Sequence, residues 1–238
     1  MKPILVVTHE RSGTHLLINL INYNKNGQFT TIGFINNYYN KTLTIDDYKW
    51  QVYKDIISNS YDDSLVCKSH HQIEFFENYL DFLFEKYHVI YVKRELKDVL
   101  VSYYKFLPFP KDKDFFPTFD EWVFSKPDDI GRKFLLPYNP DPHVIVEPEN
   151  YIERWKIHYK NWEKHRNNIL MINYEDILLN FNETKNIIEN YIKRKIGDKI
   201  PNIYDKNLPN FSPNKGIVGG YIDFISPEII SKIDNYFK

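Results

Sequence analysis

The chain has 238 residues, with 31 Lys and Arg against 32 Asp and Glu and a formal net charge of −1. This length supports one α/β domain with a sizeable core and is too short for two ordinary domains without a clear linker. The near balance of charge argues against a dedicated nucleic-acid-binding protein, which normally carries a basic excess. We therefore expect a single domain over residues 1–238 whose partners do not include nucleic acid.

The cysteine content and the apolar runs bear on the compartment. Cys67 is the single cysteine, which excludes an intramolecular disulfide and fits a reducing environment. The apolar run at residues 4–7 is too short for the core of a signal peptide, and no stretch approaches membrane-spanning length. We expect a soluble, cytoplasmic protein.

Strand-like and helix-like patterns alternate through the first half of the chain. In chain order we predict a strand at Ile4–Val7, a helix at Thr14–Tyr23, a short helix near 45–58, a strand at Leu65–Lys68, a helical segment at 72–86, a strand at His88–Val92 and a helix at Lys97–Phe106. This alternation predicts βαβ units and a mainly parallel sheet.

Residues 107–149 interrupt the alternation with eight prolines and several aromatic side chains, among them Phe109, Phe115, Phe116 and Trp122. A loop-rich insertion of this size inside a compact domain is usually functional. Two interpretations stay open, namely a pocket for an acceptor molecule and a satellite of the hydrophobic core. After the insertion we predict a helix at Tyr151–Arg166, a strand at Ile169–Ile172, a helix at 182–195, a Pro/Gly loop at Ser212–Gly220 and a final helix after Pro227.

The loop after the first strand has the composition of an anion site. Arg11 adds positive charge, Ser12 and Thr14 add hydroxyl donors, and Gly13 removes the Cβ that would keep a phosphate away from the backbone. The loop leads into a predicted helix, whose first N–H groups lack internal partners and whose dipole favours negative charge. The pattern predicts a phosphate-binding loop.

Three further segments are expected beside this loop, because ligands of open α/β sheets bind at the carboxyl ends of the strands. They are Cys67-Lys68-Ser69-His70, the strand-turn-helix unit Tyr91–Tyr104, and the basic loop Asn214–Gly220.

Together the four segments resemble the sulfotransferases that use 3′-phosphoadenosine 5′-phosphosulfate (PAPS), most closely the cytosolic type. The family's opening loop K-S-G-T-T-W corresponds to Arg11–Leu16, and its K-T-H corresponds to Lys68-Ser69-His70. Its segment Y-V-x-R-N-x-K-D-V-x-V-S-Y-Y matches Tyr91–Tyr104 at nearly every fixed place, and its Y-E-D matches Tyr174-Glu175-Asp176. Its late loop R-K-G-x-x-G-D-W-K is matched in part by Asn214–Ile222. The resemblance extends in order over residues 4–226.

The resemblance implies a three-layer α/β/α fold with a mainly parallel central sheet, the P-loop-like sulfotransferase fold. It also implies an enzyme that moves the sulfuryl group from PAPS to a hydroxyl or amine of a small-molecule acceptor. The other product is adenosine 3′,5′-bisphosphate (PAP), and no metal is required.

The resemblance also assigns roles to individual residues. Arg11 and Lys68 would stabilise charge on the departing nucleotide, and His70 would be the base, since an imidazole with a pKa of about 6.5 is largely neutral at cellular pH. The remaining expected nucleotide contacts are Ser12, Gly13, Thr14 and His15 at the 5′-phosphate, Arg94, Ser102, Asn214, Lys215 and Gly216 at the 3′-phosphate, and Tyr174 beside the adenine.

Several positions depart from the family pattern. Leu16 replaces a Trp that stacks on adenine, so we expect that stacking to be weaker or to come from another residue. Asn214 replaces an Arg and removes one charge from the 3′-phosphate site, while Gly220 and Ile222 replace Asp and Lys. His15 replaces a Thr hydroxyl, and it either donates to a phosphate or points away.

Other functions remain to be compared with this one. A P-loop small-molecule kinase would need a second Gly followed by Lys-Ser or Lys-Thr, which the opening loop lacks. A non-catalytic nucleotide-binding module of the same fold is disfavoured by Lys68 and His70. His9, His15, His70 and His71 do not have a recognised metal-ligand spacing. His70 by itself also fits a structural histidine at a strand end, and the surrounding motif favours catalysis.

Overall fold

The computed structural model describes residues 1–25, 28–33, 43–106, 118–127, 143–201 and 217–236. A five-stranded sheet lies at the centre, in the order β2-β3-β1-β4-β5, and all of its pairs are parallel. Its strands are β1 (Ile4–Thr8), β2 (Thr30–Thr31), β3 (Val66–Ser69), β4 (His88–Lys93) and β5 (Leu170–Asn173). The predicted parallel sheet is confirmed.

The central strand β1 shows why this sheet is covered on both sides. All five of its residues are buried, as expected for a parallel strand between two helical layers. Since side chains alternate across a strand, Ile4 and Val6 contribute to one hydrophobic cluster, and Leu5 and Val7 contribute to the other.

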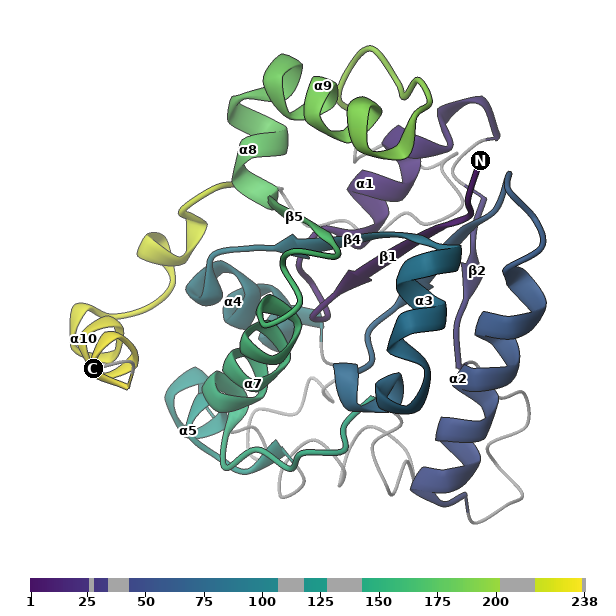
Figure 1. Ribbon diagram of the computed structural model, residues 1–238. Helices are drawn as coiled ribbons and strands as arrows, with labels where there is room; N and C mark the ends of the chain where they lie inside the picture. The colour runs from purple at the N-terminus through teal and green to yellow at the C-terminus, as the bar shows by residue number, and fades with distance from the viewer. Residues whose placement is uncertain (26–27, 34–42, 107–117, 128–142, 202–216, 237–238) are drawn as a thin grey trace.

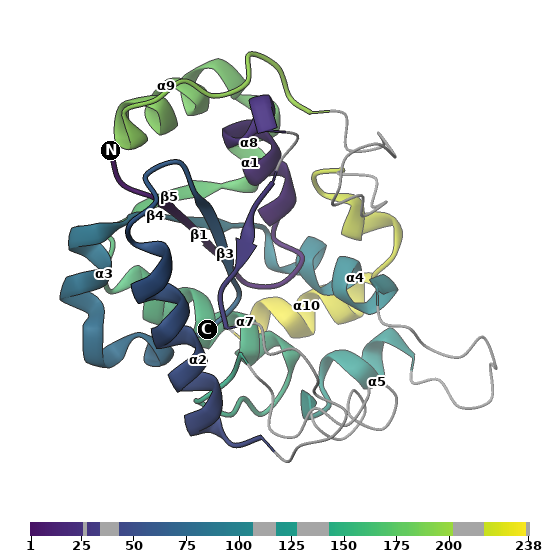
Figure 2. The same ribbon diagram turned by 90° about the vertical axis from the view of Figure 1, so that its right-hand side faces the viewer.

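Helices form a layer on each face of the sheet (Figures 1 and 2). On one face lie α1 (Thr14–Ile21), α8 (Tyr174–Leu179) and α9 (Phe181–Ile192), and on the other lie α2 (Ile45–Asn59), α3 (Leu80–Lys86) and the second half of α7 (Tyr151–Glu163). The three-layer α/β/α architecture is therefore confirmed.

A third hydrophobic cluster lies beside the sheet and joins segments from distant parts of the sequence. It contains side chains of α4 (Leu96–Phe106), α5 (Phe119–Val123), the first half of α7 and α10 (Pro227–Asn235). Trp122 of α5 is fully buried there and stacks on Tyr151, with ring centroids 4.2 Å apart. The described part of the insertion, with Phe119 and Trp122, thus behaves as a satellite core. Phe109, Phe115 and Phe116 lie outside the described residues.

The segment 72–86 differs from the continuous helical pattern predicted for it. It forms two short 3₁₀ turns, η3 (Ile73–Phe75) and η4 (Glu77–Tyr79), before α3 begins at Leu80. The segment departs from a continuous helix because Gln72 is bound to a distant part of the chain. Its side-chain oxygen accepts hydrogen bonds from the N–H groups of Ile145 and Val146. This contact fixes the start of the segment outside a helical path.

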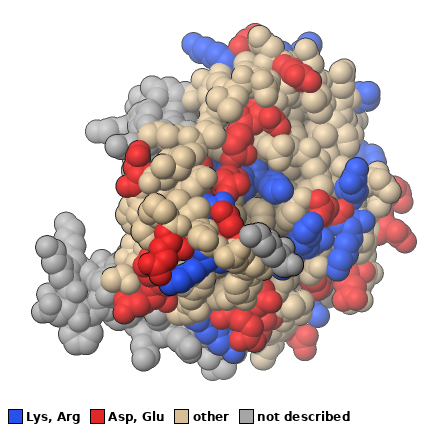
Figure 3. Space-filling view, turned by 90° about the vertical axis from the view of Figure 1, so that its left-hand side faces the viewer, with Lys and Arg blue, Asp and Glu red and all other residues tan. Residues whose placement is uncertain are grey.

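Other predicted elements agree with the structure to within a few residues, and several short ones were not predicted. The short elements absent from the prediction are β2, α5, α8 and the 3₁₀ turns η1 (Tyr23–Lys25) and η6 (Gly220–Asp223). Acidic and basic side chains are interspersed over the described part of the face shown in Figure 3. Among the described helices, none combines the length and the apolar character needed to cross a bilayer.

Candidate active site

Three of the four predicted site segments, together with the Tyr174-Glu175-Asp176 motif, lie at one edge of the sheet, because each follows the carboxyl end of a parallel strand. The opening loop follows β1 at Thr8, and His70 follows β3 directly. Arg94 follows β4, and Tyr174 follows β5. Motifs that are far apart in the sequence therefore lie close together in space.

The backbone of the opening loop requires glycine at position 13. Gly13 has φ of 98°, a conformation that disfavours side chains, and it lies at the N-terminus of α1. A Cβ on Gly13 would lie 2.2 Å from Cδ2 of Tyr174, so the Tyr174 ring occupies the space that a side chain would need. Arg11 also has a positive φ, 66°, which turns the loop sharply before α1.

Thr8 orients the imidazole ring of His70. Its Nδ1 lies 2.9 Å from the backbone oxygen of Thr8 and 3.1 Å from the Thr8 hydroxyl. A carbonyl oxygen can only accept, so Nδ1 carries the proton in the neutral ring and Nε2 is left with a free lone pair. The Thr8 hydroxyl also lies 2.6 Å from that of Thr14, which links the base to the opening loop.

The electrostatic surroundings keep the His70 ring neutral. Burial lowers its pKa well below the usual 6.5, and the nearby charge of Lys68 lowers it further. The pKa of Lys68 is itself lowered by burial. A neutral imidazole with an unprotonated Nε2 is the form in which histidine accepts a proton.

The opening loop and the Tyr91–Tyr104 motif are joined through two arginines. Nε of Arg11 donates to the Ser102 hydroxyl at 3.2 Å, and Nη1 of Arg94 donates to the backbone oxygen of Arg11 at 3.1 Å. The guanidinium of Arg94 also lies over the Tyr174 ring, 4.5 Å from its centroid. Arg11, Ser102, Arg94 and Tyr174 therefore form one connected group.

Positive charge is concentrated in this group, and some buried polar atoms in and beside it lack hydrogen-bond partners among the described residues. Burial lowers the pKa of Arg11, and so does the nearby charge of Arg94. Neither Lys68 nor Arg94 forms an ion pair with a described residue. Of the buried polar atoms that have no hydrogen-bond partner among the described residues, three lie in the expected nucleotide-binding motifs, namely Ser12 Oγ, His15 Nδ1 and Arg94 Nε. Cations and orphaned polar atoms around a glycine turn fit a ligand that carries phosphate groups.

His15 lies within reach of the same charges. Its pKa is lowered to about 4 by burial and by Lys68 and Arg11, so its ring is neutral at cellular pH. Its ring packs edge-on against Phe29, whose ring also lies under the Lys68 ammonium at 5.3 Å. His15 is therefore oriented among the cations of the site.

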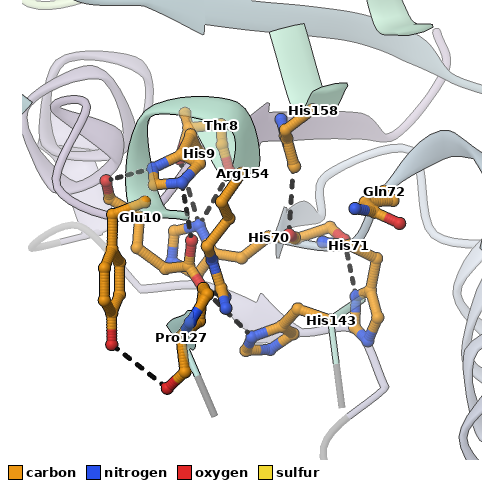
Figure 4. A network of polar contacts seen from close by, with 12 residues as sticks. Thr8, His9, Glu10, His70, His71, Gln72, Pro127, His143, Arg154 and His158 are labelled. Carbon is orange, nitrogen blue, oxygen red and sulfur yellow. Dashed lines mark hydrogen bonds and ion pairs between the residues drawn. The ribbon is translucent and has the colours of Figure 1, made fainter. Parts of the chain in front are cut away.

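A second polar network, which was not predicted, surrounds the base (Figure 4). Arg154 donates from Nη2 to Glu10 Oε1 at 2.7 Å, and His143 Nδ1 lies 3.3 Å from the same oxygen. Burial alone would raise the pKa of Glu10, but Arg154, His9 and His143 together hold it well below the usual value. The carboxylate is therefore charged and paired beside His70.

The backbone of His70 is fixed by a buried histidine. His158 Nε2 lies 3.1 Å from the His70 carbonyl oxygen, and the Tyr91 hydroxyl lies 2.9 Å from His158 Nδ1. Because the carbonyl accepts, Nε2 of His158 carries the proton and Nδ1 accepts from Tyr91. Burial lowers the pKa of His158 to about 3, so the His158 ring is neutral at cellular pH. Tyr91 was noted only as part of the motif, and His158 gave no signal in the sequence.

Asp98 of the Tyr91–Tyr104 motif is bound to the C-terminal segment. Its carboxylate accepts hydrogen bonds from the backbone N–H groups of Gly219 and Tyr221 at 2.7 and 3.0 Å. Asn214, Lys215 and Gly216 lie outside the described residues. Leu16 is buried in the core cluster under α1.

Among the described residues, no group of three or more His, Cys, Asp or Glu side chains is arranged to hold a metal ion. His9, His70, His71 and His143 lie near one another, but they contact carbonyls, hydroxyls and Glu10.

Comparison with known protein families identifies the family of this chain. The family described as the sulfotransferase domain matches residues 1–238. The chain belongs to the sulfotransferase family. The prediction made from the four motifs is confirmed at this level, and the P-loop kinase is not supported.

Solved structures agree with the sulfotransferase fold. A mouse sulfotransferase, SULT7A1, crystallised with PAP, has a TM-score of 0.63 at 18% identity, covering 99% of this chain and 83% of that one. A retinol dehydratase complexed with retinol and PAP has a TM-score of 0.60 at 16% identity, covering 99% of this chain and 80% of that one. The retinol dehydratase complex with androsterone and PAP gives 0.59 at 14% identity, with 99% and 79% covered. A comparison with curated protein sequences gave no match.

Proposed function

We propose that this sulfotransferase is a single cytoplasmic domain that moves the sulfuryl group of PAPS to a hydroxyl or amine of a small-molecule acceptor. The observation that carries the proposal is the neutral His70, oriented by Thr8 and adjacent to Lys68, at the edge of the sheet where Arg11 and Arg94 converge. Cys67 is the single cysteine, so the chain forms no intramolecular disulfide, which fits a reducing compartment.

The fold relatives support both ligands. The mouse sulfotransferase and the retinol dehydratase were crystallised with PAP, and the latter also with retinol or androsterone. Their nucleotide matches the two sets of phosphate-binding residues expected here, and their other ligands are small molecules that carry a hydroxyl.

Two groups of residues would hold the nucleotide. Ser12, Gly13, Thr14 and His15 surround the start of α1, where backbone N–H groups and the helix dipole favour the 5′-phosphate. Arg94 and Ser102 would hold the 3′-phosphate, together with Asn214, Lys215 and Gly216 of the late loop. Nε of Arg94 and Oγ of Ser12, which lack partners among the described residues, would then each donate to a phosphate oxygen.

The transfer step needs a base and stabilisation of negative charge. When bound, PAPS supplies an activated sulfuryl group. Nε2 of His70 would receive the proton of the acceptor hydroxyl, because Nδ1 is held by the Thr8 carbonyl. Lys68 and Arg11 would balance the charge that develops on the departing phosphate, a kind of contact whose loss typically costs about 2.7–4 kcal/mol of transition-state stabilisation.

One experiment identifies the reaction and the acceptor together. The protein is incubated with labelled PAPS and a host metabolite extract in EDTA, and labelled products are identified by mass spectrometry. A labelled product that forms without magnesium is expected. Tight PAP binding with no sulfated product from a broad acceptor panel would instead indicate a non-catalytic nucleotide-binding module, and phosphate transfer from ATP with magnesium would indicate a kinase.

A further inference from the structure

One face of helix α7 contacts both the opening loop and the segment that carries the proposed base. Arg154, His158 and Trp162 follow one another at intervals of four residues, so they lie on the same side of the helix. All three side chains are buried. The first of them, Arg154, donates to Glu10 of the opening loop at 2.7 Å.

The other two side chains of this face bind successive carbonyl groups just after β3, which ends at Ser69. Nε2 of His158 lies 3.1 Å from the His70 carbonyl oxygen, as Figure 4 shows. The indole N–H of Trp162 donates to the His71 carbonyl oxygen at 3.2 Å. The backbone that carries the proposed base is therefore held by α7 at the point where it leaves the sheet.

Tyr91 determines which nitrogen of His158 faces His70. The Tyr91 hydroxyl, on β4, lies 2.9 Å from Nδ1 of His158, and both side chains are buried. A hydroxyl that donates to Nδ1 leaves the ring proton on Nε2, from which it is donated to the His70 carbonyl. The ring of His9 packs edge-on against that of His158, with centroids 5.7 Å apart. The His158 ring is thus fixed at both nitrogens and along one edge.

The orientation of the His70 ring depends on the position of its backbone. Nδ1 of His70 lies 2.9 Å from the Thr8 carbonyl oxygen, and a displaced His70 peptide would lengthen this hydrogen bond. The lone pair of Nε2 would then no longer point in one fixed direction. A misplacement of about 1 Å in an active site can lower a rate by about a hundredfold.

We propose that His158, oriented by Tyr91, is a positioning residue for sulfuryl transfer, which fixes the His70 peptide so that Nδ1 meets the Thr8 carbonyl and Nε2 faces the acceptor. This inference rests on the proposed function, in which His70 is the base. His158 touches neither the nucleotide nor the acceptor in this account, and its effect reaches the reaction only through His70.

The first test removes the donor at position 158 and then restores it. His158→Met deletes both ring nitrogens, whereas His158→Gln carries an amide N–H group as many bonds from the backbone as Nε2 of histidine. The transfer rate is measured with saturating labelled PAPS and a fixed amount of host metabolite extract, and PAP affinity is measured by calorimetry.

We expect His158→Met to transfer about tenfold to a hundredfold more slowly, because the base is no longer held in place. PAP affinity should stay within about twofold of that of the unmodified chain, and His158→Gln should recover most of the rate. A normal rate in a folded His158→Met variant, or an equal loss of PAP affinity, would overturn the proposal. A His158→Gln variant as slow as His158→Met would also overturn it, because the donor would then not be the cause.

A spectroscopic measurement tests the positioning without turnover. The His70 Nδ1–H is bonded to the Thr8 carbonyl, so we expect a slowly exchanging ring-proton signal in the NMR spectrum of the unmodified chain. His158→Met should abolish this signal, and His158→Gln should retain it. The proposal fails if the signal is absent from the unmodified chain or is the same in all three proteins. If the signals behave as expected but no sulfated product forms, the proposed function alone fails.

If His158→Met does not fold, Tyr91→Phe is compared with Tyr87→Phe. Both variants lose one buried, hydrogen-bonded hydroxyl, and that of Tyr87 donates to the Ile56 carbonyl at 2.7 Å. Tyr87 precedes β4 at its amino end, away from the site, so it is a matched control. We expect Tyr91→Phe to transfer about threefold to tenfold more slowly and Tyr87→Phe to keep the unmodified rate. Equal rates in the two variants would overturn the proposal.

Discussion

The backbone oxygen of Thr8, at the end of strand β1, lies 2.9 Å from Nδ1 of His70, which follows the neighbouring strand β3. This contact uses a main-chain atom of the central strand, so no side-chain substitution at position 8 removes it. It determines which nitrogen of the ring carries the proton. Together with burial, it makes His70 a base that is ready at neutral pH.

The pH dependence of turnover should reflect this environment. Because burial and Lys68 lower the His70 pKa well below 6.5, the unprotonated form persists as the pH falls. We expect the acidic limb of the kcat/KM profile to lie well below pH 6.5, the usual pKa of histidine. In Lys68→Met the neighbouring charge is absent, so the His70 pKa rises and the limb moves to higher pH. An acidic limb near pH 6.5 that does not respond to Lys68→Met would contradict the assignment.

Arg94 should recognise the 3′-phosphate and not the rest of the nucleotide. Arg94→Ala removes a guanidinium whose Nε has no partner among the described residues, and we expect PAP affinity to fall by about tenfold or more. Affinity for adenosine 5′-monophosphate, which lacks the 3′-phosphate, should change little. Arg94→Lys should recover only part of the loss, because an ammonium lacks the planar donor arrangement. Equal losses for both nucleotides, measured by calorimetry, would place Arg94 elsewhere.

The Glu10–Arg154 pair should matter for stability in a pH-dependent way. Arg154→Met leaves a buried carboxylate without its main partner, a change that typically costs about 3–5 kcal/mol of unfolding free energy. In the unmodified chain the Glu10 pKa is lowered, so its stabilisation is present above the unfolded pKa and is lost as pH falls through the folded pKa. In Arg154→Met, burial raises the folded pKa instead, so the deficit should be larger at pH 7 than at pH 4.

Denaturant unfolding of Arg154→Met at pH 7 and at pH 4 measures this difference in unfolding free energy. Lys232→Met is the control, because it breaks an ion pair with Glu228 on the exposed surface of α10. That variant should unfold at the same denaturant concentration as the unmodified chain. A deficit in Arg154→Met that does not vary with pH would show that the loss comes from packing alone.

Glycine at position 13 should be required, whereas glycine at 197 should not. Gly13→Ala adds a Cβ at 2.2 Å from the Tyr174 ring in a backbone conformation unfavourable to alanine. We expect about 2–4 kcal/mol of destabilisation and weaker PAP binding. Gly197→Ala places its Cβ no closer than 3.4 Å to Cβ of Tyr23, so its melting temperature should be near that of the unmodified chain. Similar melting temperatures for the two variants would show that the Gly13 turn is not strained.

The parts of the site that could be predicted are local in sequence. The opening loop, Lys68-Ser69-His70 and Arg94…Ser102 each follow a strand directly, so a pattern of strands and helices was enough to bring them together. The satellite core around Trp122 was one of two interpretations left open by composition alone, because an aromatic-rich loop is equally suited to a pocket or to a core.

The remaining features depend on contacts between residues far apart in the chain. Arg154 pairs with Glu10 across 144 positions, and Asp98 meets Gly219 across 121 positions. A charged residue within a predicted helix normally faces water, so nothing local indicated that Arg154 is buried. The break in the helical segment at Gln72 has the same origin, since its partners Ile145 and Val146 lie beyond the insertion.

The most direct test of the account is sulfuryl transfer by His70→Asn, measured with labelled PAPS in EDTA beside the unmodified protein. The amide of Asn retains a donor for the Thr8 carbonyl and lacks a basic nitrogen. The account predicts that kcat falls by about a hundredfold to ten-thousandfold while PAP binds as before. Near-normal turnover in that variant would contradict the assignment of His70 as the base.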